Sequence, residues 1–317
     1  MQLEPILTMN YKMSYNTNNI DKVLGQRVDS PDRYSPSILV REERQRNRTY
    51  LGLQNESLPF VGYDIWNGYE CSSITDSGLP VSFVAKVVYA ATNPYIVESK
   101  SMKLYWNGFN MQPSGRTPKE VLKNVKATAE KDLSALLETP VKVEFYTQKL
   151  EGDYLKENDW FNSYGGWDVL EDIPEANKMK FTVFNESADL LKLDGKVDID
   201  WVEARYMSTL LRSNCKITKQ PDSGDIFIAY RSKKAVTKAS LLEWIVSFRN
   251  ECHFHEEICE AAYKRLWDFL QPEDLIVTCF YARRGGWDIV PTRASSKKLL
   301  DKALINPKSP YFKFPRQ

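Results

Sequence analysis

The chain has 317 residues, of which 42% are apolar, so we expect about two globular domains with buried cores rather than a disordered protein. Lysine and arginine total 43 against 42 for aspartate and glutamate, and a net charge of +1 gives no basis for predicting direct binding to nucleic acid. The sequence has neither an apolar run of roughly 18 residues, as a membrane span requires, nor the basic and apolar segments of a signal peptide, so we expect a cytoplasmic protein with no membrane partner.

The N-terminal part predicts a leader followed by a hairpin. Residues 1–55 are polar and rich in Asn, Arg and Ser, and their weak periodicity predicts an irregular leader. Two segments with strand character, 60–74 and 81–89, then flank the turn cluster 75–78. We therefore expect two antiparallel strands.

A helix and a third strand complete the first predicted module. Thr117-Pro118-Lys119-Glu120 is a capping box with proline at the first helical position, and apolar residues recur at helical spacing from Val121 to Leu137. Pro140 ends this helix. Residues 141–145 alternate between apolar and polar side chains, which predicts a strand.

The second half of the sequence repeats this order of elements after a charged connector, residues 151–195. A strand is predicted over 225–230, a helix over 241–248, a second helix over 258–270 and an apolar strand over 275–281. The fold class is thus predicted to be α+β, with antiparallel sheets covered by helices on one side.

The repeated order places the domain boundaries. We predict a leader over 1–55, an N-terminal module over 56–150, a connector over 151–195 and a C-terminal module over 196–317. The two modules are in tandem.

The stretch from Ser213 to Asp222 is the first candidate for chemistry, because Cys215 precedes the carboxylate of Asp222 by seven residues and Pro221 predicts a turn. A thiolate is a useful nucleophile when its ionised form is favoured and another group transfers protons, and an aspartate brought back by a turn suits the second role. The only two histidines, His253 and His255, lie close together further along the chain. These residue types predict covalent catalysis by a cysteine.

Plainer interpretations stand beside this one. A free cysteine is usually a small buried hydrophobic residue, an aspartate between Pro221 and Ser-Gly is typical of an ordinary turn, and the histidines fit a helix start. Cys252 and Cys259 near the histidines suggest a metal, but structural zinc needs four well-spaced ligands and no second cluster is present, so we predict no metal. The five cysteines lack C-x-x-C pairs, so no disulfide framework is predicted either.

Four segments carry a family resemblance. Val97–Tyr105, Ser213–Asp222, Phe254–Glu256 and Arg283–Ile289 resemble, in this order, the motifs of the NADPH-dependent 7-cyano-7-deazaguanine reductases, the nitrile reductases of queuosine biosynthesis. Their placement resembles the long, two-module form of that family. The resemblance implies that each module is a tunnelling fold, a four-stranded antiparallel sheet with two helices between its second and third strands.

The resemblance also implies a mechanism. Cys215 would add to the nitrile carbon and form a covalent thioimide, Asp222 would supply the proton to nitrogen, and His255 would help deliver protons. NADPH would reduce the thioimide, and a second NADPH would reduce the resulting imine to the primary amine.

Binding roles follow from the same resemblance. Glu98, Ser99, Phe254 and Glu256 would bind the deazapurine, because an ionised carboxylate offers two acceptors to its adjacent N–H donors. The implied cofactor-binding residues are Ser99, Lys100, Lys103, Arg283, Arg284 and Gly285. Lys100 and Lys103 also fit a solvated helix face. No G-x-G-x-x-G turn is present to argue for nicotinamide binding independently.

One departure and two rival functions remain. The family usually has tryptophan after the aspartate of Gln-Pro-Asp, whereas this chain has Ser223, a change expected to widen the pocket or alter the proton donor's environment. The rivals are an amidine-forming relative that uses ammonia instead of a nicotinamide, and a non-catalytic deazapurine-binding module. The resemblance further implies a homodimer, with a product that is passed to transfer RNA by other enzymes.

Overall fold

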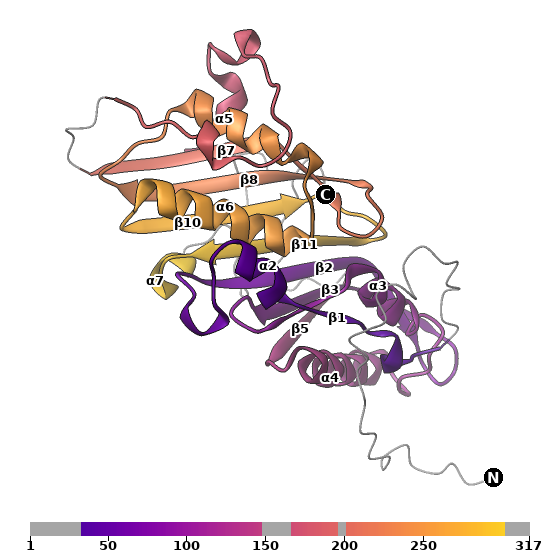
Figure 1. The fold of residues 1–317 in the computed structure, drawn as a ribbon. Coiled ribbons are helices and arrows are strands. Elements are labelled where there is room, and N and C mark those ends of the chain that lie inside the picture. The colour runs from indigo at the N-terminus through magenta and orange to yellow at the C-terminus, as the bar shows by residue number, and fades with distance from the viewer. Residues whose placement is uncertain (1–32, 148–165, 196–200, 302–317) are drawn as a thin grey trace.

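The computed structural model describes residues 33–147, 166–195 and 201–301, and it shows a mixed α+β protein, as the sequence predicts (Figure 1). One large sheet runs through the molecule with the strand order β5-β3-β2-β11-β10-β8-β7-β6. No helix in the described ranges is both long and apolar enough to cross a membrane.

The C-terminal half contains four antiparallel strands in the order β7-β8-β10-β11, with two helices between the second strand and the third. The hairpin β7–β8 was predicted only in its second strand, because a register shift between Ser208 and Leu211 interrupts the alternation of β7. Its elements are β7 (Val202–Cys215), β8 (Pro221–Ser232), α5 (Lys238–Ser247), α6 (His255–Leu270), β10 (Asp274–Tyr281) and β11 (Trp287–Ala294).

The N-terminal half repeats this plan, and its described residues contribute three strands, β2, β3 and β5, to the large sheet. The predicted hairpin is confirmed, and its first strand is shifted in register between Gly68 and Cys71, close to the equivalent place in β7. The elements of this half are β2 (Val61–Ile74), β3 (Pro80–Ala90), β4 (Tyr95–Val97), α3 (Ser99–Asn107), α4 (Pro118–Leu137) and β5 (Val141–Tyr146).

Helix α4 shows why the sequence pattern predicted this helix correctly. The Thr117 hydroxyl accepts a hydrogen bond from the backbone N–H of Glu120 at 3.2 Å, which confirms the predicted cap. The helix ends at Leu137, and Glu138 follows in the left-handed conformation with φ 52°. Its apolar stripe packs on β2, β3 and β5, and the buried residues of that stripe are Val121, Val125, Ala129, Leu133, Leu136 and Leu137.

The two halves share one sheet because β2 and β11 pair antiparallel, from Gly68 opposite Trp287 to Val61 opposite Ala294. Helices α4, α5 and α6 lie on the same face of this sheet (Figure 1). Side chains that alternate toward that face, such as Val277 and Trp66, form the two largest core clusters.

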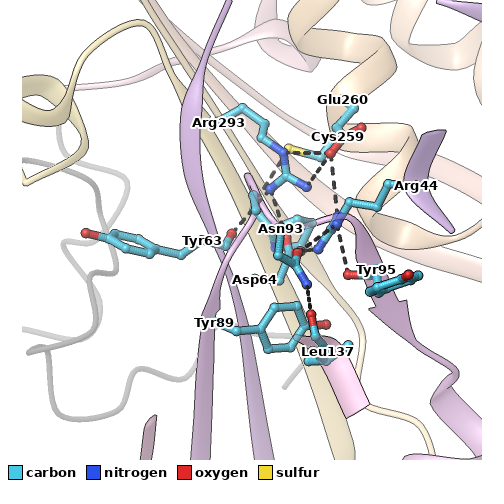
Figure 2. A network of polar contacts seen from close by, with 12 residues as sticks. Arg44, Tyr63, Asp64, Tyr89, Asn93, Tyr95, Leu137, Cys259, Glu260 and Arg293 are labelled. Atoms are coloured by element: carbon cyan, nitrogen blue, oxygen red, sulfur yellow. Dashed lines mark hydrogen bonds and ion pairs between the residues drawn. The ribbon is translucent and has the colours of Figure 1, made fainter. Parts of the chain in front are cut away.

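Part of the predicted irregular leader is regular, which corrects that expectation over residues 41–50. Strand β1 (Arg41–Glu43) pairs antiparallel with β4, and helix α2 (Arg44–Tyr50) packs near α6. Helix α2 buries Arg44, Asn47 and Arg48 instead of apolar residues, so hydrophobic periodicity did not reveal it. Figure 2 shows the buried polar cluster around Arg44.

Short elements complete the chain. Residues 166–195 of the predicted connector contain single turns rather than long helices. These elements and the remaining short ones are η1 (Pro36–Ile38), η2 (Asn55–Ser57), β6 (Asp168–Val169), η4 (Leu170–Asp172), η5 (Ala176–Lys178), η6 (Ala188–Leu190), η7 (Phe248–Asn250), β9 (Cys252–His253) and α7 (Lys297–Leu300).

Candidate active site

A cavity of about 330 Å³ lies where the two halves meet, and it brings together segments that are far apart in the sequence. Its walls come from the start of α3, the β7–β8 turn, the start of α6 and the loop before β11. Within the described residues, every side chain predicted from the sequence to belong to the site lines this cavity except Arg283. The volume lies in the range of small-molecule sites.

Cys215 is the last residue of β7, and it is a free, partly exposed thiol. Its backbone N–H donates to the carbonyl of Gln220 at 2.8 Å, and its carbonyl accepts from the N–H of Lys219 at 3.0 Å, so a tight turn fixes its position. Lys219 adopts a left-handed conformation, with φ 58°. The turn therefore precedes Pro221, and the expectation of a turn at the proline itself was wrong.

Asp222 lies in strand β8, paired with Ser213, and its side chain is 4% exposed. His255 Nε2 is 3.3 Å from its Oδ2, and Arg284 donates to its Oδ1. Burial acts to raise the pKa of Asp222, but the hydrogen bonds and positive charges of His255 and Arg284 outweigh burial and hold this pKa below its ordinary value. Asp222 is thus an ionised carboxylate at neutral pH.

His255 begins helix α6, and its ring lies 4.0 Å from the ring of Tyr281, measured between centroids. Arg284 also donates to the side-chain oxygen of Gln220, in the turn that follows Cys215. Arg284 thus connects the turn that follows Cys215 with the carboxylate of Asp222.

His253 belongs to a second ionic chain that the sequence did not reveal. Its ring nitrogens lie 3.2 Å from Glu251 and 3.3 Å from Glu257. Hydrogen bonds to these carboxylates raise the pKa of His253 to about 9, so it is a cation at neutral pH. Glu257 also accepts from Lys216 Nζ at 2.9 Å and from the backbone N–H of Phe254 at 3.0 Å.

Phe254 and Glu256 form the wall at the start of α6. The ammonium of Lys216 lies 5.0 Å from the centroid of the Phe254 ring. Glu256 is 1% exposed, and its Oε1 has no hydrogen-bond partner among the described residues. Burial, and then the charge of Asp64, raise the pKa of Glu256 to about 8.

Glu98 caps helix α3 at the opposite wall. Its Oε1 accepts from the N–H of Lys100 at 2.9 Å, and its Oε2 accepts from the N–H of Ser101 at 2.7 Å. Its own N–H donates to the carbonyl of Val40 at 2.8 Å, so the segment next to β1 supports the site. Burial, and then the charge of Arg284, lower the pKa of Lys103.

The loop before β11 separates the two predicted arginines. Arg284 points into the cavity, whereas the Arg283 guanidinium lies 4.5 Å from the centroid of the Tyr69 ring and does not line the cavity. Gly285 and Gly286 have φ of +56° and +75°, which favours glycine at both positions. A Cβ on Gly286 would also lie 2.7 Å from Glu70 Oε2.

Two tryptophans contribute to the cavity, and neither was predicted as a site residue. The rings of Trp66 and Trp287 lie 6.5 Å apart between centroids. A Cβ on Gly68 would lie 2.4 Å from the Trp287 ring, so this glycine leaves the space that the indole fills. The motif that carries Trp287 was visible in the sequence, but its side chain's orientation depends on the β2–β11 pairing.

Ser223 lies away from the cavity, so of its two expected effects the wider pocket is not found, whereas an altered environment of Asp222 stays a prediction. Strand alternation places Asp222 on the helix-covered face together with Ile226, and Ser223 on the opposite face together with Phe227. Ser223 is not among the described residues that line the cavity. The loss of a tryptophan at this position therefore does not widen the cavity.

The arrangement combines the Cys215 thiol, the Asp222–His255 pair and the carboxyl groups of Glu98 and Glu256. Lys100, Lys103 and Arg284 add cationic groups that fit the phosphates of a dinucleotide. Among the described residues, no three His, Cys, Asp or Glu side chains are grouped so that they could hold a metal ion.

Comparisons with known proteins agree on one family. Residues 30–145 match the family model "Nitrile reductase, 7-cyano-7-deazaguanine-reductase N-term", and residues 221–299 match "QueF-like protein". An NADPH-dependent 7-cyano-7-deazaguanine reductase of Hahella chejuensis is 37% identical over 294 residues, which is 93% of this chain and 97% of the relative. The enzyme of the same name from Bordetella avium is 37% identical over 282 residues, which is 87% of this chain and 94% of the relative.

A solved structure with a smaller similarity is the archaeosine synthase QueF-Like in the apo form. It is 20% identical, covers 31% of this chain and 97% of its own, and has a TM-score of 0.27.

Proposed function

The chain belongs to the family of NADPH-dependent 7-cyano-7-deazaguanine reductases, which are oxidoreductases, and from this premise we propose that it reduces the nitrile of 7-cyano-7-deazaguanine to 7-aminomethyl-7-deazaguanine. The observation that carries the proposal is that Cys215, the Asp222–His255 pair and Glu256 line one cavity. The product serves queuosine-type biosynthesis, and this chain makes no direct contact with nucleic acid.

Cys215 is the nucleophile. Its sulfur bonds to the nitrile carbon while one π bond of the nitrile breaks. The thiol loses its proton and the nitrile nitrogen gains one, which yields a thioimide. Partial exposure at the end of β7 supports this role, since Cys71, Cys259 and Cys279 are buried.

The Asp222–His255 pair handles the protons. Asp222 is ionised because its pKa is low, so it must receive a proton before it can donate one. His255, whose Nε2 lies 3.3 Å away, delivers that proton. Arg284 competes for the same carboxylate. If Arg284 moved toward a bound phosphate, its hydrogen bond to Asp222 would weaken and the pKa of Asp222 would rise. Asp222 would then be a better proton donor.

Glu98 and Glu256 hold the base, and Phe254 packs against its ring. An ionised carboxylate accepts two adjacent N–H donors, which suits the edge of a deazaguanine. Oε1 of Glu256 is buried without a partner in the described structure, and a ligand's N–H group would satisfy it.

Lys100, Lys103 and Arg284, with Ser99 and Gly285 nearby, would hold NADPH, which supplies hydride when bound. Reduction of a nitrile to an amine takes four electrons, so two NADPH are consumed for each nitrile. Arg283, predicted as a further phosphate ligand, needs to leave Tyr69 before it can take that role.

The finer points of fold and assembly belong to the same proposal. Each half is a tunnelling-fold module, with boundaries at 56–150 and 196–317, and the protein is a cytoplasmic homodimer. The repeated strand and helix order of the two halves supports the modules. Light scattering in solution tests the dimer, and a monomer would contradict it.

The decisive experiment follows NADPH absorbance after the nitrile is added. We expect two NADPH oxidised for each nitrile, and no oxidation by Cys215→Ala. Cys252→Ala is the matched control, because Cys252 is the other partly exposed free cysteine and should be dispensable. Ammonia-dependent loss of nitrile without NADPH oxidation would instead indicate an amidine-forming enzyme, and ligand binding without any turnover would indicate a binding module.

A further inference from the structure

A buried cluster of five ionic side chains lies near Glu256 of the cavity, and Figure 2 shows four of its members, Arg44, Asp64, Glu260 and Arg293. It joins α2, β2, α6 and β11, so both halves of the protein contribute. All of its members are at most 2% exposed, and they are Arg44, Arg48, Asp64, Glu260 and Arg293.

The contacts within this cluster are close. Glu260 accepts from Arg48 Nε at 3.0 Å and from Arg48 Nη2 at 2.7 Å, and it also accepts from Arg293 Nη2 at 3.1 Å. Asp64 accepts from Arg293 Nη1 at 2.8 Å and from Arg44. Arg44 Nη1 lies 3.5 Å from Glu260, so Arg44 and Arg293 are each shared by both carboxylates.

The charges within the cluster do not cancel. Burial acts to raise the pKa of Asp64 and of Glu260, but the surrounding arginines outweigh burial and keep both pKa values below their ordinary range. Three guanidinium groups against two carboxylates leave one positive charge. A buried charge without a counter-charge is costly, so the cluster favours a further negative group nearby.

Glu256 is that nearby group. It precedes Glu260 by four residues on α6, so the two side chains share a helix face. Arg44 and Arg293 favour its ionised form, whereas burial and Asp64 oppose it. Tyr89 faces it from β3 and stays neutral, because burial raises the pKa of this tyrosine well above its ordinary value.

We propose that the cluster is the counter-charge that lets Glu256 ionise when a deazapurine binds, so that ligand binding releases a proton to solvent. This inference rests on the proposed function. When Glu256 is protonated, its O–H group faces the N–H groups of the base, and two donors repel each other. When Glu256 is ionised, both of its oxygens accept hydrogen bonds from these N–H groups. Arg44 and Arg48 lie in a segment for which no functional role was predicted, and they then act as positioning residues.

Calorimetry on the full-length Cys215→Ala protein tests the proton release without thiol chemistry. The probe is 7-cyano-7-deazaguanine at pH 7, titrated in buffers that differ in ionisation enthalpy. With the pKa of Glu256 at about 8, we expect release of about 0.9 proton per site and an affinity that rises about tenfold from pH 6 to pH 7. Adding Glu256→Gln should abolish the release.

Arg44→Met in the same background tests the role of the cluster. Removal of one positive charge makes Glu256 hold its proton more strongly, so affinity at pH 7 should fall at least tenfold and recover above pH 9. Arg44→Lys keeps the charge and should restore the pH profile. Arg46→Met is the matched control, because Arg46 is an exposed residue of the same helix and should change nothing.

The outcomes separate this inference from the function. Tight binding with the same enthalpy in every buffer, or release that persists in Glu256→Gln, overturns the inference and leaves the proposed function intact. If wild type neither binds the nitrile nor oxidises NADPH, the proposed function fails and the inference fails with it. The calorimetry stands without the Arg44 variants should these not fold.

Discussion

Nε2 of His255 lies 3.3 Å from Oδ2 of Asp222, at the point where the start of α6 meets the beginning of β8. Cys215 lines the same cavity, so in the proposed mechanism this pair would protonate the nitrile nitrogen when the thiol adds to the carbon.

Asp222→Asn should therefore lower kcat by about 10²–10⁴-fold, because an amide cannot relay the proton. Covalent addition to the nitrile should slow as well, as measured by intact mass of the protein without NADPH. Asp189→Asn, at an exposed aspartate outside the cavity, serves as control. Near wild-type turnover in Asp222→Asn would remove Asp222 from the mechanism.

Arg284→Ala should raise the pKa of Asp222, because the carboxylate loses one of the charges that now offset its burial. If Asp222 works in its protonated form, the alkaline limb of the kcat profile should move to higher pH, and the KM for NADPH should rise. Arg283→Ala should leave the profile in place, since Arg283 stacks on Tyr69. Identical profiles in both variants would contradict the coupling.

Ser223→Trp should leave kcat and the KM for the nitrile within about threefold of wild type, because side chains of adjacent strand residues point to opposite faces and Ser223 points away from the cavity. Steady-state kinetics provide the check. A large change in the KM for the nitrile would mean that this position acts on the cavity after all.

Glu257→Gln should lower the pKa of His253, which two carboxylates raise to about 9. Proton NMR of the imidazoles gives the measurement, and the chain has only two histidines to resolve. A raised pKa stabilises the folded state fully below pH 6.5, and this contribution is lost as pH rises through about 9. Urea unfolding of wild type should show that loss, and Glu257→Gln should show less of it.

Gly68→Ala should displace the Trp287 ring, because the added Cβ would lie 2.4 Å from it. We expect a loss of about 1–3 kcal/mol in the free energy of unfolding and a higher KM for the nitrile. Gly195→Ala is the control, since its Cβ would meet no described atom within 4 Å. An unchanged KM would mean that Trp287 does not shape the site.

The sequence predicted elements whose stability comes from apolar burial. Helix α4 and the β2–β3 hairpin follow their hydrophobic periods closely. Helix α2 was missed because it buries arginines that are paired with Asp64 of β2 and Glu260 of α6. Strand β7 was missed because its bulge shifts the alternation by one residue.

The candidate site was predictable as a set of motifs but not as a network. Cys215, Asp222 and Glu98 meet in one cavity, as the resemblance implied. Glu257 contacts Lys216, which lies 41 residues away in the chain, and this contact depends on how the turn after β7 meets the start of α6. The predicted helix began at residue 258, whereas α6 begins at His255 and has Glu257 in its first turn.

The pairing of β2 with β11 has a consequence for how the proposed enzyme would turn over. Glu98 belongs to the N-terminal half and Cys215 to the C-terminal half, and the β2–β11 pairing joins these halves in one sheet, so a hinge between the halves would have to break the ladder from Gly68 to Val61. Two NADPH molecules would then bind and leave one after the other through an opening of nearly constant width, while the half-reduced substrate stays bound. Side chains at the edge of this opening, Arg284 above all, would control the binding and release of NADPH.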